Sequence, residues 1–270
     1  MKLIKPSFEI LHQSEGLDGI YKQIELAGRT CYKSEDKITE DSAKGFVDRM
    51  IKSGHGAMLE HGTVYLSIPI RLGTQPTIER YLYNCYSKVS KCNVDNHHYY
   101  CVTTNLRVLI ENEWMDDLCY LCEPTEYHVK RMTVKFICDR GVSHEFVRHR
   151  VFSFAQESTR YCNYSKDKFG NEITYIQPCW EMQKDEEELF LLQLEQAQNT
   201  YNALTSSGWK PQEARAVLPN SLKTELVMTG FTSDWEHFFF LRTPVNAHPQ
   251  ARELAIPLKE EFIARKYINN

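Results

Sequence analysis

The chain has 270 residues, a net charge of −4, and apolar and charged fractions of 42% and 25%. These values are ordinary for a folded globular protein with an ample core, and the acidic balance argues against a dedicated nucleic-acid-binding protein. No apolar run is long enough to span a bilayer, and the N-terminal residues show no secretory signal pattern. We therefore expect a cytoplasmic protein that contacts neither membranes nor nucleic acid.

The nine cysteines are an odd number scattered along the chain, which indicates reduced thiols rather than a disulfide framework. Cys119 and Cys122 form a C-x-x-C pair, but no second pair lies at the spacing of a structural zinc site. The segment 113–122 is typical of a short amphipathic helix with Cys122 pointing inward. We favour buried thiols here and expect no metal site.

Hydrophobic periodicity predicts a strand followed by two helices at the start of the chain. The strand is expected over residues 2–12, and the first helix over 17–27, ending at Gly28. The second helix is expected to begin near residue 41 and to stop at Gly54. Three apolar side chains should lie on its inner face: Phe46, Met50 and Ile51.

Residues 55–130 have a less regular hydrophobic pattern than the first 54 residues. Residues 55–61 are typical of a loop or a helix start, and residues 63–72 predict a strand. Residues 73–130 have mixed periodicity, and we expect an insertion of short helices there.

The remainder of the chain alternates strands and helices. Strands are expected at 132–141, 172–178 and 222–231. Helices are expected at 142–150, 185–204, 210–219, 233–243 and 246–264. The helix at 185–204 should carry apolar residues at helical spacing on its inner face, among them Leu189 and Leu192. We expect one α+β domain over 1–270, with an antiparallel sheet flanked by helices and a central insertion at about 73–130.

The segment 148–161, RHRVFSFAQESTRY, is the most informative part of the sequence. Arginine carries a planar fork of five donors that suits phosphate, carboxylate and uracil-like edges, and it stays charged at any working pH. The backbone amides of 158–160 can form an anion-accepting turn. A basic surface patch is the alternative, which the density of these residues makes less favourable.

Two further arginines, Arg215 and Arg242, stand among apolar neighbours. Arg242 must reach water or be paired, because burial of an unpaired cation is costly. Asp234 or Glu236 would be a structural partner, and an anionic ligand is the alternative.

Histidine and glycine motifs narrow the choice of chemistry. His55, Glu60 and His61 do not fit the H-E-x-x-H zinc helix, so contacts to a ligand or a capping role are favoured, and His248 is ambiguous alone. The chain lacks G-x-G-x-x-G, G-x-x-x-x-G-K-[ST] and G-x-S-x-G. A bound nucleotide would therefore be held by arginines and other side chains.

The RHR tripeptide 148–150, followed after seven residues by Ser158, resembles the motif of the flavin-dependent thymidylate synthases (ThyX). Three further segments match that family in order: GHGAMLEH at 54–61, EARAVLP at 213–219, and FLRT with NAHPQA within 240–251. The resemblance implies a homotetramer of α+β subunits, with FAD and dUMP bound where several subunits meet. It also implies reductive methylation of dUMP to dTMP, with methylenetetrahydrofolate as carbon donor and NADPH as the reductant of the flavin.

The resemblance further implies the ligand contacts. The residues expected to contact dUMP are Glu145, Phe146, Arg148, Gln156, Glu157, Ser158, Thr159, Arg160, Arg215 and Arg242. Those expected to contact FAD are His55, Ala57, Arg148, His149, Arg150, Gln156, His237 and His248. Arg242 matches the arginine that stabilises deprotonated uracil N3, so it is the expected catalytic residue. Residues 156–160 would form a phosphate-side turn given to a neighbouring subunit's site.

The chain departs from the family pattern at three places, one of which is residues 231–233, where the polar Asn/Arg pattern of some members is absent. Ala155, Gln156 and Glu157 stand where members commonly carry Asn-Glu-Leu or Asn-Gln-Leu, and Glu145 stands where a glutamine is often found. The alternative function is a non-catalytic nucleotide- or RNA-binding module that stacks bases on three aromatic residues, Phe152, Phe154 and Tyr161.

Overall fold

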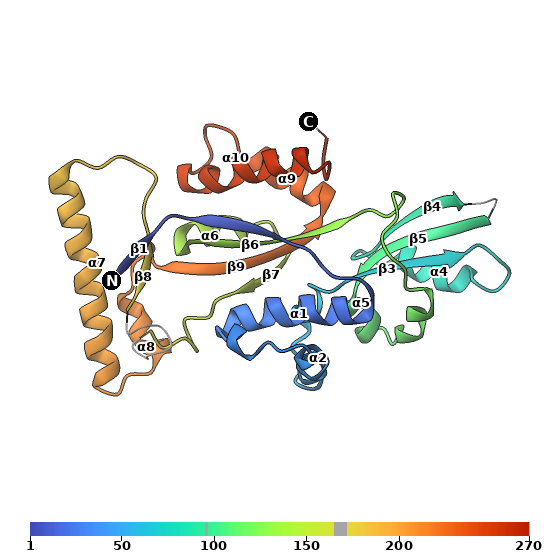
Figure 1. Cartoon of the computed structure of the whole chain (residues 1–270), viewed down its shortest axis with the longest axis horizontal. Helices are drawn as coiled ribbons and strands as arrows, with labels where there is room; N and C mark the ends of the chain where they lie inside the picture. Colours follow the sequence, from blue (N-terminus) through green and yellow to red (C-terminus); the bar gives the residue numbers. More distant parts are fainter. Residues whose placement is uncertain (95–96, 165–171, 270) are drawn as a thin grey trace.

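A four-stranded antiparallel sheet in the order β2–β6–β9–β7 forms the centre of the molecule (Figure 1). The computed structural model describes residues 1–94, 97–164 and 172–269. The strands of the central sheet are β2 (Ser7–Leu11), β6 (Arg131–Asp139), β9 (Lys223–Phe231) and β7 (Ser153–Gln156). Helices cover both faces of this sheet, which confirms the predicted α+β class with an antiparallel sheet flanked by helices.

One face of the sheet carries the main apolar core. Because successive strand residues point to opposite faces, Leu226 and Met228 of β9 share this face with Phe136 of β6. Two helices, α9 (Thr232–Arg242) and α10 (Pro249–Ala264), pack over it (Figure 1).

The other face packs against α1 (Gly16–Tyr32), which contacts β7 and β9. A small apolar patch of Ala27, Ala155 and Val227 joins helix and sheet. Helix α1 was predicted to end at Gly28, and this is wrong. A Cβ at Gly28 would lie 2.4 Å from the Phe46 ring, so the glycine permits close helix packing instead of ending the helix.

Helix α2 (Ser42–Lys52) packs against α1 and is followed by α3 (Gly56–Leu59). Phe46 and Met50 are buried as predicted, but Ile51 is 41% exposed. Val47 is fully buried in its place, because the buried stripe of α2 runs through 46, 47 and 50. A 3-10 turn, η1 (Glu35–Lys37), connects α1 and α2.

Beyond one end of the central sheet lies a smaller antiparallel sheet in the order β3–β5–β4 (Figure 1). Its elements are β3 (Thr63–Pro69), α4 (Gln75–Leu82), β4 (Lys88–Val94), β5 (His97–Asn105), α5 (Leu106–Glu111) and η2 (Met115–Tyr120). The expectation of short helices alone was wrong, because two strands lie here. Residues 101–105 are buried on both faces of the strand, which removes the alternation that would have identified it. The sheet also includes β3, which lies before residue 73.

The opposite end holds α7 (Lys184–Ser206), the longest helix, which was predicted over 185–204. Ala197 and Tyr201 are buried, but Leu189 and Leu192, expected to point inward, are 69% and 61% exposed. The inner face of α7 runs through Phe190, Leu194, Ala197 and Tyr201 instead, so these two leucines lie outside it. Nearby elements are α8 (Pro211–Ala214), η4 (Arg215–Val217), and β1 (Lys2–Ile4) paired in parallel with β8 (Thr174–Ile176).

The first predicted strand is divided in two, β1 and β2, around Pro6. Proline has no backbone N–H for a strand ladder, which accounts for the break.

Within the described ranges, no helix combines the length and apolar character that a membrane crossing requires.

Candidate active site

The RHR residues lie in a turn between α6 (Arg140–Phe146) and β7. The helix begins where Asp139 Oδ1 accepts a hydrogen bond from the Val142 amide at 2.7 Å, an N-cap that satisfies a free helix donor. It ends at Phe146, so the predicted helix through Arg150 is too long. The His149 amide donates to the Phe146 carbonyl at 3.1 Å and closes the turn.

The segment after the turn is strand β7. Gln156, its last residue, points toward α6 and donates from Nε2 to Ser143 Oγ at 2.9 Å and to Thr224 Oγ1 at 3.2 Å. The amide side chain of Gln156 is therefore fixed between α6 and β9.

Arg242, at the end of α9, is held by Glu145, which precedes the RHR motif, and by His149 within the motif. Its Nη1 donates to Glu145 Oε2 at 2.8 Å, and its Nη2 donates to the Glu145 carbonyl at 2.6 Å. Its Nε donates to His149 Nε2 at 2.9 Å. The partner of Arg242 is therefore Glu145 of α6, not the nearby Asp234 or Glu236 that the sequence suggested.

His149 is a neutral acceptor in this cluster. Burial lowers its pKa to about 4, and the positive charges of Arg242 and His237 act in the same direction. At neutral pH the imidazole is uncharged, so Nε2 can accept the hydrogen bond from Arg242. His237 lies on α9, with its ring centroid 6.4 Å from that of His149.

The Glu145 carboxylate lies between two guanidinium groups. Arg148 Nη1 is 3.3 Å from Glu145 Oε1, on the side away from Arg242. The Arg148 side chain is 69% exposed, and Arg150 is also exposed. These two arginines can therefore face an anionic ligand, whereas the negative charge of Glu145 is offset by its neighbours.

Phe146, also predicted to contact dUMP, is a core residue. Its ring is fully buried in the core and packs against Phe136 and Phe238, both at 5.0 Å between ring centroids. Only the main chain of Phe146 is available to a ligand.

The predicted phosphate-side turn follows β7. The Ser158 amide donates to the Cys31 carbonyl at 2.9 Å, and the Arg160 amide donates to Ser158 Oγ at 3.3 Å. These amides already have partners, so an anion would be held mainly by side chains. Arg160 is exposed, and Arg215 of η4 donates from Nη1 to Thr159 Oγ1 at 2.9 Å.

His55 and Ala57 are exposed at the start of α3, a helix that contacts β7. His55 helps to line an open cleft of about 710 Å³ between α1 and α2, which sequence reasoning missed. Its basic lining side chains are Arg29, Lys37, Arg49, Lys52 and His55. The basic residues are spread over 27 positions, so only the packing of the two helices brings them together.

The remaining predicted site residue, His248, is exposed at the N-cap of α10. Its ring lies 6.4 Å from that of Trp180.

In the ranges that the structure describes, no group of three or more His, Cys, Asp or Glu side chains could hold a metal ion. Cys119 is exposed and Cys122 is half-buried, so the expected burial of this pair was wrong. The segment forms the 3-10 helix η2, whose three-residue turn changes the faces that an α-helix would present.

Comparison with known proteins gives one consistent family. The model of the family described as thymidylate synthase complementing protein matches residues 127–265, just over half of the chain. The flavin-dependent thymidylate synthase of Geobacter sulfurreducens is 31% identical over 119 residues, which are 44% of this chain and 50% of the relative. The enzyme of that name from Mycobacterium marinum is 24% identical over 264 residues, covering 92% of this chain and 77% of the relative.

The chain thus spans about half the length of the Geobacter relative and about three quarters of the Mycobacterium one. A solved UMP/dUMP methylase, PolB from Streptomyces cacaoi, is 17% identical with a TM-score of 0.47, over 98% of this chain and 93% of that one. The matched region contains the RHR turn, Arg215 and Arg242. By the family match, this chain belongs to the thymidylate synthase complementing proteins, the ThyX family.

Proposed function

We propose that the chain is a flavin-dependent thymidylate synthase that methylates dUMP to dTMP, with FAD as cofactor and methylenetetrahydrofolate and NADPH as co-substrates. The observation that carries this proposal is the cluster of Arg242, Glu145 and His149 at the RHR turn. Family membership and the shared name of the relatives support it.

The donor groups of the chain fit FAD and dUMP, both of which carry phosphate. Arg148, Arg150 and Arg160 are exposed guanidinium groups on one turn–strand–turn segment, and guanidinium matches phosphate geometry. His55 adds a polar side chain at the edge of a basic cleft. The chain therefore supplies arginine and lysine side chains where many nucleotide-binding proteins use glycine-rich loops.

Arg242 is suited to stabilising negative charge on a uracil edge. Its guanidinium plane is fixed by two hydrogen bonds to Glu145 and one to His149, and the neutral imidazole adds no second negative charge beside it. A preorganised donor of this kind stabilises charge at uracil N3 without reorganisation during the reaction. FAD, when bound, would supply the hydride that reductive methylation of the pyrimidine requires.

Glu145 would otherwise place a negative charge near the dianionic substrate. Its pairing with Arg242 and Arg148 offsets that charge, so the acid is compatible with dUMP next to Arg148. In the proposed complex Glu145 orients both guanidinium groups.

The proposal includes a homotetramer and a site shared between subunits. The predicted ligand contacts lie on separate elements of one chain, at the RHR turn, at α3, and at the turn after β7. Phe240 and Leu241, next to Arg242, are 73% and 44% exposed, and exposed apolar side chains of this kind favour burial by a second subunit.

The alternative, a non-catalytic nucleotide- or RNA-binding module, is not supported. Phe152 is buried against Trp235 and Phe154 is half-buried, so only Tyr161 of the three expected stacking residues is exposed.

A titration with FAD, followed by anaerobic reduction, tests the proposal. The purified protein is expected to bind FAD and show the absorbance bands of oxidised flavin, and NADPH is expected to bleach them. Addition of dUMP should then change the flavin spectrum, whereas AMP at the same concentration should not. A protein that takes up no FAD would contradict the proposal.

A further inference from the structure

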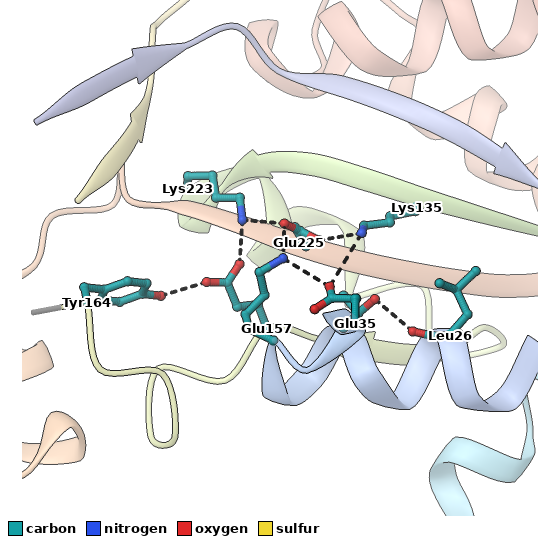
Figure 2. Close-up of polar contacts among 9 residues, drawn as sticks. Leu26, Glu35, Lys135, Glu157, Tyr164, Lys223 and Glu225 are labelled. Atoms are coloured by element: carbon teal, nitrogen blue, oxygen red, sulfur yellow. Dashed lines mark hydrogen bonds and ion pairs between the residues drawn. The ribbon is translucent and has the colours of Figure 1, made fainter. Parts of the chain in front are cut away.

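A network of three lysines and three glutamates lies on the sheet face that packs against α1 (Figure 2). Its six members are Lys33, Glu35, Lys135, Glu157, Lys223 and Glu225. The network is adjacent to the turn of Ser158–Arg160, since Glu157 immediately precedes that turn. The Glu157 amide donates to the Glu225 carbonyl at 2.8 Å and extends the pairing of β7 with β9.

Glu225 is the centre of this network. Its Oε1 accepts from Lys223 Nζ and from Lys33 Nζ, both at 2.5 Å, and its Oε2 is 2.6 Å from Lys135 Nζ. Burial alone would raise the pKa of Glu225, but Lys223, Lys33 and Lys135 outweigh it and lower the pKa to about 2. Glu225 therefore keeps its charge over the whole working range of pH.

Glu157 is the member of the network that belongs to the turn. Its side chain is 1% exposed, with Oε2 accepting from Lys223 Nζ at 2.8 Å and Oε1 accepting from the Tyr164 hydroxyl at 3.0 Å. Burial and the charge of Glu157 raise the pKa of Tyr164 well above its usual value, so this hydroxyl stays protonated and donates. The carboxylate thus points into the protein, away from any ligand on the turn (Figure 2).

Lys33 joins the end of α1 to this network. Lys33 has a left-handed conformation, with φ 45° and ψ 54°, which is unfavourable for a residue with a Cβ. This conformation ends α1 and turns Lys33 toward Glu225. Two residues earlier, the Cys31 carbonyl accepts from the Ser158 amide, so the same end of α1 also holds the turn.

We infer that Glu157 and Lys223 form a positioning pair for the phosphate-side turn, fixing Ser158, Thr159 and Arg160 for dUMP. The inference rests on the proposed function and adds a role for Glu157 that its neighbours in the turn do not have. Glu157 contributes its main chain to the turn and uses its carboxylate as an anchor on β9.

Glu157→Gln keeps the size of the side chain and removes its charge. Without the ionic anchor, the turn should be held less tightly, and both KM and Kd for dUMP should rise about tenfold, since a hydrogen bond to a charged group is worth about that factor. The kcat at saturating dUMP should stay within about twofold, because the turn does not contact the reacting carbon. Lys223→Arg keeps the cation and should stay close to wild type.

Asp117→Asn is a matched control for a purely structural effect. Asp117 is also a buried carboxylate that accepts from a basic side chain, Arg80, and from a tyrosine hydroxyl, Tyr81, but it lies in the smaller sheet's module. The Asp117→Asn variant should have a lower thermal unfolding midpoint than wild type, as Glu157→Gln should, but its affinity for dUMP should be unchanged.

The measurements are steady-state kinetics of the FAD-loaded enzyme, calorimetric titration with dUMP, and thermal unfolding of each variant. Equal dUMP affinity in Glu157→Gln and wild type would overturn the inference, and so would an equal loss of affinity in Asp117→Asn. If Glu157→Gln does not fold, the double variant Glu157→Gln/Lys223→Met removes both charges and leaves Glu225 paired with Lys33 and Lys135. Its dUMP affinity must then fall by a similar factor.

Measurements of dTMP formation and of dUMP binding by the wild-type protein distinguish a failure of this inference from a failure of the proposed function. A wild-type protein that binds dUMP but forms no dTMP would contradict the proposed function, and the calorimetric comparison would still test the pair. A wild-type protein that binds no dUMP would overturn both.

Discussion

At the scale of single residues, the site depends on how Arg242 is held. Its guanidinium has one charged partner, Glu145, and one neutral partner, His149, so it keeps a fixed plane and a net positive character. A lysine could not reproduce three directed hydrogen bonds, because its ammonium group lacks the planar fork.

Removal of this guanidinium should affect turnover far more than cofactor binding. Arg242→Ala is expected to lower kcat for dTMP formation about 100-fold or more, the effect of deleting one preorganised donor, while FAD remains bound. Arg265→Ala, which removes an exposed arginine paired with Glu261, should leave kcat unchanged. Near-normal turnover in Arg242→Ala would contradict the role given to Arg242.

A second residue-level prediction concerns acid stability. Burial, with the charge of Arg131 acting in the same direction, lowers the pKa of His61 to about 3, below the usual 6.5. The unfolded chain therefore binds a proton below about pH 6.5 that the folded chain does not, and the free energy of unfolding should fall as pH drops from 6.5 toward 4. One such group contributes a slope of about 1.4 kcal/mol per pH unit.

Chemical denaturation between pH 7 and pH 4.5 measures this slope. The slope for His61→Gln should be smaller than the wild-type slope by the contribution of about one bound proton. His149 contributes to the slopes of both proteins in the same direction. Identical slopes in the two proteins would show that His61 is protonated in the folded state.

The candidate site residues stand out in the sequence more clearly than the residues that they contact. The RHR segment, Arg215 and Arg242 stand out by residue type and local spacing. The pairing of Arg242 with Glu145 joins residues 97 positions apart, and the sequence offered two nearer acids. Likewise, the anchoring of Glu157 on Lys223 depends on the register of β7 against β9.

At the scale of elements, prediction succeeded where one periodicity runs without interruption. β6, β9 and α7 were expected close to their observed bounds, because each has a long, regular pattern. The end of α6 was predicted too late, since the apolar residues after Phe146 continue the helical spacing into a turn. In residues 73–130, burial of β5 on both faces concealed the strand.

Gly28 gives a test of helix packing at this scale. Gly28→Ala improves helix propensity by up to about 1 kcal/mol, but the new Cβ meets Phe46, and overpacking of this kind costs about 1–3 kcal/mol. We expect net destabilisation by about 1 kcal/mol, measured by urea unfolding. Gly45→Ala, where only Arg49 Nη1 lies near at 3.7 Å, should stabilise the protein instead. Stabilisation by both substitutions would contradict the packing role of Gly28.

At the scale of the whole molecule, the central sheet separates two kinds of interior. One face holds the aromatic core under α9 and α10, and the other holds the charged network and the turn after β7. The proposed site draws on both faces and on α3, which is compatible with ligands that several subunits surround.

Mixing of inactive variants tests whether the site is shared between subunits. Arg242→Ala and Arg160→Ala should each be nearly inactive alone. If the two residues serve one site from different subunits, mixed oligomers should regain about one quarter of wild-type activity, the fraction of sites that receive both intact residues. If activity does not recover although subunit exchange is verified, Arg242 and Arg160 of each site come from the same chain.

Transfer of the carbon is the most direct test of the proposed function. The FAD-loaded protein is incubated with dUMP, NADPH and methylenetetrahydrofolate labelled at the methylene carbon, and the nucleotide product is separated and counted. The proposal predicts labelled dTMP from the wild-type protein and almost none from Arg242→Ala. Unlabelled nucleotide from a wild-type protein that has bound FAD and dUMP would contradict it.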